Sequence, residues 1–140
     1  MNIELANLAP LLANLNRYPE IAEPIMRDAT YAALLSMIPD LATYPSQSST
    51  TYRRTGTLGR LWGAAQPEFN AQGNGFQARI GNATPYGPFV QGGSDDSPSQ
   101  TQTMADKGWA NVADVIEAHQ GGFDAYLEAA LNKVLLAIGA

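Results

Sequence analysis

The sequence has no cysteine among its 140 residues, which excludes disulfides, thiolate metal sites and cysteine nucleophiles. Charged residues are scarce at 15%, fewer than a freely soluble monomer usually carries, whereas hydrophobic residues make up 45%. No apolar run approaches the roughly 18 residues that a membrane span requires, and no basic region precedes the first apolar residues. We therefore expect one globular domain over residues 1–140, made in the cytoplasm, with protein neighbours and no membrane contact.

Positive charge is concentrated in the middle of the chain, although the net charge is −5. Residues 53–93 carry four arginines against one acid, net +3, whereas residues 1–52 have net charge −3 and residues 94–140 have net charge −5. Such a basic segment can bind phosphates or carboxylates, or it can pair with acidic segments of the same or a neighbouring subunit. Three of its arginines fall within the stretch TTYRRTGTLGRLW: Arg53, Arg54 and Arg60.

Apolar residues at three- and four-residue spacing predict helices in the N-terminal half. The most regular face predicts a long helix over about residues 20–38, which Pro39 should end. A shorter helix is expected before it, around residues 3–15. Another is expected over residues 57–65, with Thr57 as its N-cap.

Two further helices are predicted in the last third of the chain. The stretch WANVADVIEAH places its apolar residues on one helical stripe, and a second stripe runs from Phe123 to Ile138. Gly121 and Gly122 lie between them and should end the first helix. His119, the only histidine, would then lie near the carbonyl end of that helix, where a cation is favoured. Because a Ser-His-Asp arrangement cannot be identified from sequence, we interpret His119 as a cap or surface residue.

Alternation of apolar and polar residues around GNG predicts a β-hairpin over residues 69–80. The hairpin glycines also match the dinucleotide pattern G-x-G-x-x-A, but that motif needs a βαβ unit, so we interpret them as turn residues. A proline-interrupted strand over about residues 86–91 should form an edge of the same sheet. The expected fold is α+β, with a small antiparallel sheet packed on a long N-terminal helix and two C-terminal helices. One core should contain Leu58, Trp62, Ile80, Trp109, Ile116, Leu127 and Leu131.

Two polar segments lack hydrophobic periodicity, and we predict extended loops over residues 45–55 and 92–107 that become ordered against neighbouring subunits. Asp95 and Asp96 in the second loop could bind a hard cation or act as an acid/base pair. Adjacent carboxylates on such a loop are usually solvated surface, so no metal, cofactor or catalytic residue is assigned.

Four segments carry a family resemblance: RYPEIAEPIMRDA, YPSQSSTTYRRTGTLGRLW, ARIGNATPYGPFVQGG and KGWANVADVIEAH. In this order, over roughly residues 18–120, they resemble the tail-completion or minor tail-component proteins of long-tailed bacteriophages, which also occur in prophages. The strongest piece is the Tyr-Arg-Arg-Thr-Gly-Thr-Leu-Gly-Arg core with a tryptophan two residues on. The matching positions are Tyr52, Arg53, Arg54, Thr55, Gly56, Leu58, Gly59, Trp62, Tyr86, Val90, Gln91, Gly92, Gly108 and Trp109.

The resemblance implies a virion structural protein at the phage tail or neck, and it implies no catalytic role. It implies a six-fold ring of copies of the chain that completes the tail or joins it to the head. Contacts with neck, tail-terminator or tail-tube proteins are implied as well, in a protein made in the host cytoplasm and located in the virion. A histidine common in the family is missing from the loop after the Val-Gln-Gly piece, where this chain has SDDSPSQTQTMAD.

We expect the arginine cluster to contact acidic or carbonyl groups of neighbouring subunits. Three arginines neutralise about three phosphates, against roughly six to ten in proteins that hold duplex DNA firmly, so contact with DNA in the channel should be weak. The alternative is a small hydrolase or nucleic-acid-binding protein that uses the cluster on phosphates and His119 or Asp95 as a base, although the sequence has no motif for it. The expected subunit interface contains Tyr52, Arg53, Arg54, Arg60, Tyr86, Phe89 and Gln91.

Overall fold

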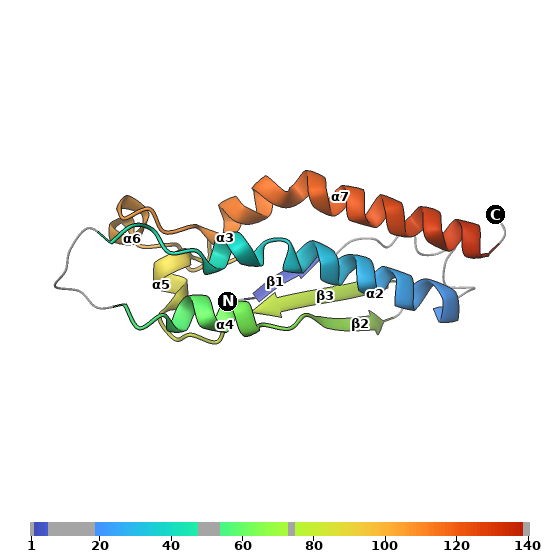
Figure 1. Cartoon of the computed structure of the whole chain (residues 1–140), viewed down its shortest axis with the longest axis horizontal. Helices are drawn as coiled ribbons and strands as arrows, with labels where there is room; N and C mark the ends of the chain where they lie inside the picture. The colour runs from blue at the N-terminus through green and yellow to red at the C-terminus, as the bar shows by residue number, and fades with distance from the viewer. Residues whose placement is uncertain (1, 6–18, 48–53, 73–74, 139–140) are drawn as a thin grey trace.

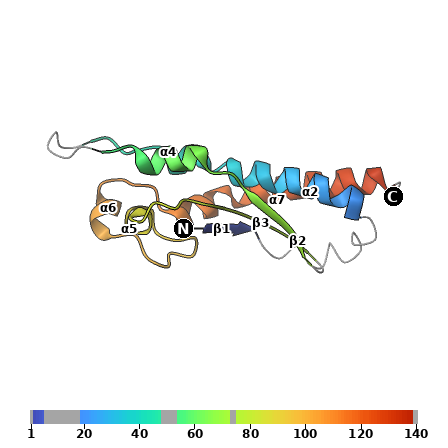
Figure 2. The same cartoon turned by 90° about the horizontal axis from the view of Figure 1, so that it is seen from below.

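Two long helices lie side by side along the molecule, and one of them covers a small sheet (Figure 1). The computed structural model describes residues 2–5, 19–47, 54–72 and 75–138. The long helices are α2 (Pro19–Leu35) and α7 (Val112–Ala137). Short helices gather toward one end of the molecule, as Figure 2 also shows. They are α3 (Ile38–Ala42), α4 (Thr57–Ala64), α5 (Gly87–Gln91) and α6 (Gln102–Asp106).

The sheet is antiparallel, with strand order β1-β3-β2. Strands β2 (Glu68–Gln72) and β3 (Gly75–Gly81) form the predicted hairpin, in which Phe69 pairs with Ala78. The α+β class and the hairpin are therefore confirmed, and β3 is a strand where a dinucleotide motif would need a helix. The third strand is β1 (Asn2–Leu5), which pairs with the other side of β3.

The helix predicted around residues 3–15 is wrong where the structure describes it, because residues 2–5 lie in β1. The rest of that prediction falls outside the described residues. Four residues are too few to show a helical period, and pairing with β3 satisfies their backbone groups instead.

The strand predicted over residues 86–91 is also wrong, because this segment is helix α5. Pro88 lies in the first turn, where its fixed φ suits a helix and its missing N–H is not needed. Gly92 ends the helix with φ 73°, and its N–H donates to the Pro88 carbonyl at 2.8 Å. A proline-containing segment therefore became a short helix with a glycine cap.

The two predicted C-terminal helices are one helix, α7, with Gly121 and Gly122 inside it. A helical glycine costs only about 1 kcal/mol, and the buried stripe of α7 continues on both sides of the pair, from Val115 through Phe123 to Val134. Asn111 is the N-cap, and its side chain accepts hydrogen bonds from the Ala113 and Asp114 N–H groups.

The long N-terminal helix was predicted over residues 20–38, and α2 covers residues 19–35. The prediction that Pro39 ends this helix is wrong, because α2 ends at Leu35 and Pro39 lies in the first turn of α3, where its missing N–H is not needed. Helix α4 covers residues 57–64, but its N-cap is Gly56 in the left-handed region, not Thr57. Residues 92–107, predicted as an extended loop, contain α6, whereas residues 48–53 of the other predicted loop lie outside the described residues.

The buried side chains form two clusters rather than the single core that was predicted. Leu127 and Leu131 pack on the smaller cluster, which lies between α2 and α7. All members of the predicted core are at least partly buried. The larger cluster contains or contacts the other five: Leu58, Trp62, Ile80, Trp109 and Ile116.

The glycines of α7 give a direct test of its continuity. A Cβ at Gly121 or Gly122 would meet no atom within 4 Å. Replacing either with alanine should raise the free energy of unfolding by about 0.5–1 kcal/mol, because alanine loses less backbone entropy in a helix. Denaturant unfolding followed by circular dichroism measures the change.

Gly59→Ala is the matched control, because a Cβ there would lie 2.7 Å from the Ala42 carbonyl oxygen. This substitution should destabilise by about 1–3 kcal/mol through overpacking. Destabilisation by both helix variants would show instead that α7 is broken at the glycine pair.

Candidate protein-interaction site

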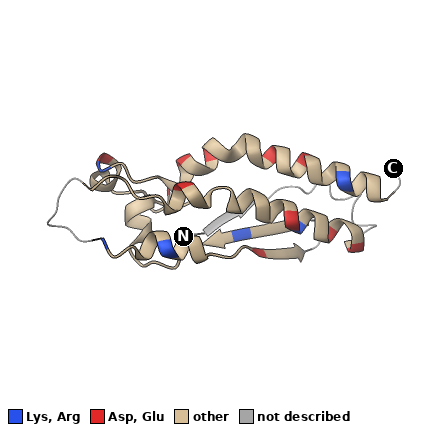
Figure 3. Ribbon diagram, viewed as in Figure 1, with Lys and Arg blue, Asp and Glu red and all other residues tan. Residues whose placement is uncertain are grey.

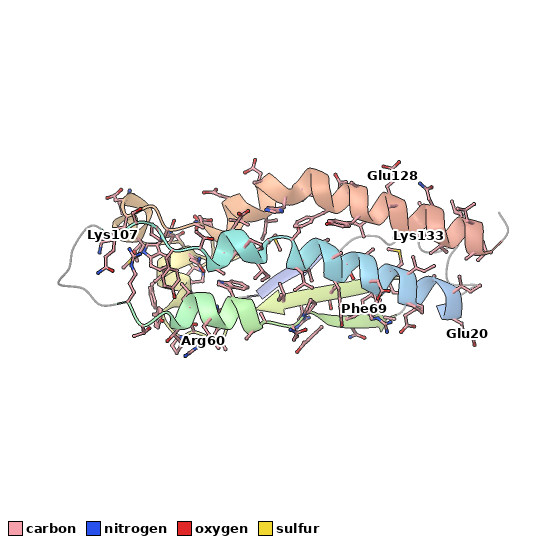
Figure 4. The ribbon with its side chains drawn as sticks, in the orientation of Figure 1. Glu20, Arg60, Phe69, Lys107, Glu128 and Lys133 are labelled. Carbon is pink, nitrogen blue, oxygen red and sulfur yellow. The ribbon has the colours of Figure 1, made fainter. Side chains whose placement is uncertain are left out.

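The residues predicted for the subunit interface fall into different environments. Tyr52 and Arg53 lie outside the described residues. Arg60 is exposed on α4, and Tyr86 and Phe89 are 43% and 59% exposed at the start and middle of α5. Three of the predicted residues therefore lie on the surface at the short-helix end, where Figure 4 labels Arg60.

Gln91 has no exposed surface, which corrects its assignment to the interface. Its Oε1 accepts a hydrogen bond of 2.8 Å from the Trp62 indole N–H, and its Nε2 donates at 2.8 Å to the Leu41 carbonyl. Asn82 is also buried, and its Nδ2 donates to the Leu58 carbonyl at 2.9 Å. These two amides are polar members of the core that tie α3, α4 and α5 together.

Arg54 is half-buried and contacts its own chain rather than pointing freely into solvent. Its guanidinium carbon lies 5.9 Å from the centroid of the Tyr44 ring and 5.2 Å from that of Trp109. One terminal nitrogen, Nη1, donates to the Pro45 carbonyl. Nε is buried and has no hydrogen-bond partner among the residues that the structure describes.

A cavity of about 140 Å³ opens beside Arg54. Two cationic side chains, Arg54 and Lys107, line it, and no acidic residue occurs among the lining residues that the structure describes. Aromatic side chains form much of the wall, which makes the site suitable for a small anionic group with an apolar neighbour. Its aromatic lining residues are Tyr44, Tyr86 and Trp109.

Asp95 and Asp96 stabilise their own loop. The Asp95 carboxylate accepts from the Ser97 N–H at 3.0 Å, and the Asp96 carboxylate accepts from the Gln100 N–H and the Asn111 side chain. Asp96 has φ 59°, which an aspartate tolerates in such a turn. Within the described ranges, no three metal-ligating side chains gather into a group.

His119 lies inside α7 rather than at a helix end, which corrects its assignment as a cap. Its Nε2 is 2.7 Å from the Asp40 carboxylate, and its Nδ1 is 3.3 Å from the Ser36 hydroxyl. The hydroxyl donates its one proton to the Ala33 carbonyl at 2.6 Å. Ser36 is therefore not activated by the imidazole as a nucleophile would be, and the trio links α7 to the α2–α3 turn.

No family model, curated protein or solved structure matches this chain. None of the helices in the described part of the chain is long and apolar enough to cross a membrane.

The buried bridge through Gln91 predicts a large effect on stability. Gln91→Leu removes the partners of the Trp62 N–H and the Leu41 carbonyl, and each unsatisfied group costs about 1–3 kcal/mol. The free energy of unfolding should therefore fall by about 2–4 kcal/mol in denaturant titrations. Exposed Gln66→Leu is the control and should change it by less than about 0.5 kcal/mol. Equal changes in the free energy of unfolding for the two variants would show that the Gln91 hydrogen bonds do not stabilise the core.

Arg54 should stabilise the subunit, whereas Arg60 should not. Arg54→Ala removes two ring contacts of about 0.5–1 kcal/mol each and one hydrogen bond, so unfolding should become easier by about 1–3 kcal/mol. The tryptophan emission should shift to the red as the Trp109 ring gains water. Arg60→Ala removes only an exposed side chain and should leave both quantities unchanged, so a stable Arg54→Ala protein with unshifted emission would refute the assignment.

Proposed function

We propose that this protein is a structural component of the tail or neck of a long-tailed bacteriophage. It forms a ring with copies of itself that completes the tail or joins it to the head, next to neck, tail-terminator or tail-tube proteins. The resemblance of four ordered segments supports this proposal, as does the low charge content of 15%.

The observation that carries the proposal is the exposed aromatic pair of α5. Tyr86 and Phe89 stay exposed although the same short helix buries Val90 and Gln91 in the core. Two loop contacts hold α5 in place, because the Thr101 N–H donates to the Phe89 carbonyl at 3.0 Å and the Gln100 side chain donates to the Val90 carbonyl at 2.6 Å. A rigid, exposed aromatic anchor beside a cationic cavity is typical of protein–protein interfaces.

Strong DNA binding is not favoured by the described arginines. Arg54 is engaged with Tyr44, Trp109 and the Pro45 carbonyl, and the whole chain has net charge −5. A protein that holds duplex DNA neutralises more phosphates than the remaining cations of this end can reach. The hydrolase alternative also lacks support from Ser36, whose proton is donated to a backbone carbonyl.

Genetic complementation in a phage that encodes this chain tests the proposal. Deletion of the gene should leave heads and tails that are not joined or tails that are not completed, as seen by electron microscopy. The wild-type chain should restore infectious particles and be found in them at the neck or tail. Infectious particles that lack the protein would refute the proposal.

Phe89→Ser should fail to restore particles, because it removes the exposed anchor while leaving the buried face of α5 intact. Leu136→Ser is the matched control, since Leu136 is 78% exposed at the far end of α7. The folded state of both variants is checked by thermal melting. Equal complementation by the two variants would contradict the role of α5.

A further inference from the structure

Helix α7 carries a row of acidic residues on one outer face. At 100° per residue, positions 114, 117, 121, 124 and 128 fall within a sector of about 80° on one side of the helix, and all of them except Gly121 are acidic. All four acidic side chains are exposed, and Figure 3 shows acidic positions along α7. We name this row the acidic stripe; it consists of Asp114, Glu117, Asp124 and Glu128.

Cationic side chains line the cavity at the short-helix end, although exposed Asp106 on α6 lies at the same end. Lys107 and Arg54 line the cavity, and Arg60 is exposed on the neighbouring helix α4. Figure 4 shows Glu128 on the outer side of α7, well separated from Lys107 and Arg60. One subunit therefore presents an anionic helix face and a cationic cavity in different places.

The cavity suits a single carboxylate side chain. Its volume of about 140 Å³ is close to that of cavities that hold one benzene-sized group. The Arg54 guanidinium is already half-buried in the single subunit, so much of its desolvation cost has been met by folding. A carboxylate offers acceptors to the Arg54 guanidinium that lines the cavity, and it brings the opposite charge to Lys107.

We propose that the acidic stripe of one copy docks at the Arg54 cavity of the next copy. The inserting carboxylate comes from Glu117 or Glu128, because the Asp124 carboxylate accepts from Gln120 and Asp114 lies in the first turn of α7, where the helix dipole favours it. The contact joins two different surfaces, so it repeats head to tail and closes into a ring when the rotation allows. This inference rests on the proposed ring and specifies its subunit contact.

Charge reversal with rescue tests the contact, with the size of the full-length protein measured by sedimentation velocity at low and high salt. The stripe variant is Glu117→Lys/Glu128→Lys, and the cavity variant is Arg54→Glu/Lys107→Glu. Each alone should raise the apparent dissociation constant of self-association at least tenfold, about 1.4 kcal/mol. A mixture of the two variants should regain association, because each reversed face then meets a complementary one.

Matched controls separate this contact from a general charge effect. The control for the stripe variant is Glu20→Lys/Glu23→Lys on α2, which changes the net charge by the same amount. The control for Lys107→Glu is Lys133→Glu on α7. Both controls should leave self-association unchanged. To cover the case in which Arg54→Glu unfolds the chain, the single variant Lys107→Glu is tested as well. Lys107 is exposed, so this variant should melt at the wild-type temperature and still weaken self-association.

The outcomes distinguish the contact from the function. A protein that stays monomeric at every concentration, or an oligomer that both reversals leave intact, overturns the contact. If the same variants complement the phage deletion, the contact is wrong while the structural role stands. If the charge-swapped mixture associates but the protein is absent from particles, the contact stands and the proposed function fails.

Discussion

The short-helix end depends on one buried polar bridge, the Gln91 side chain between the Trp62 indole and the Leu41 carbonyl. An amide buried without partners would be costly, so both of its hydrogen bonds fix the relative positions of α3, α4 and α5. Once Val90 and Gln91 face the core, the geometry of one helical turn leaves Phe89 outside, and Tyr86 precedes the helix as its N-cap. The exposure of Phe89 is thus a consequence of the buried amide.

The secondary structure of segments with a strong apolar period was predicted correctly from the sequence. It was predicted wrongly where a proline or glycine is compatible with more than one conformation. The apolar faces of α2 and α4 and the alternation around GNG each favoured one structure, and the α+β class followed from them. Pro88 permits a helix start as well as an edge strand, and Gly121 permits a helix interior as well as a helix end. Tertiary packing determined both conformations. The buried Gln91 side chain requires hydrogen-bond partners in the core, and the buried apolar face of α7 packs in clusters with α2 residues on both sides of the glycine pair.

The candidate site was predictable only in part. Tyr86 and Phe89 were predicted to lie at a subunit interface, and both are exposed. Gln91 looked like another polar surface residue, because no pattern in a sequence marks an amide that bridges two buried groups. The cavity joins Tyr44, Arg54 and Lys107 from three separate segments, and only the folded chain brings them together. The stacking of Arg54 on two rings likewise depends on contacts that sequence spacing does not encode.

The separation of acidic and cationic surfaces favours a head-to-tail assembly over a two-fold dimer. With 15% charged residues, the molecule has few charges, yet acids line the outer face of α7 while cations line a cavity at the short-helix end. A two-fold interface built on either surface would bring like charges together, which is destabilising. A head-to-tail contact pairs the acidic stripe with the cavity in every subunit and leaves neither surface without a partner in a closed ring. The same contact without closure would give a filament, so the rotation between neighbouring subunits decides between the two.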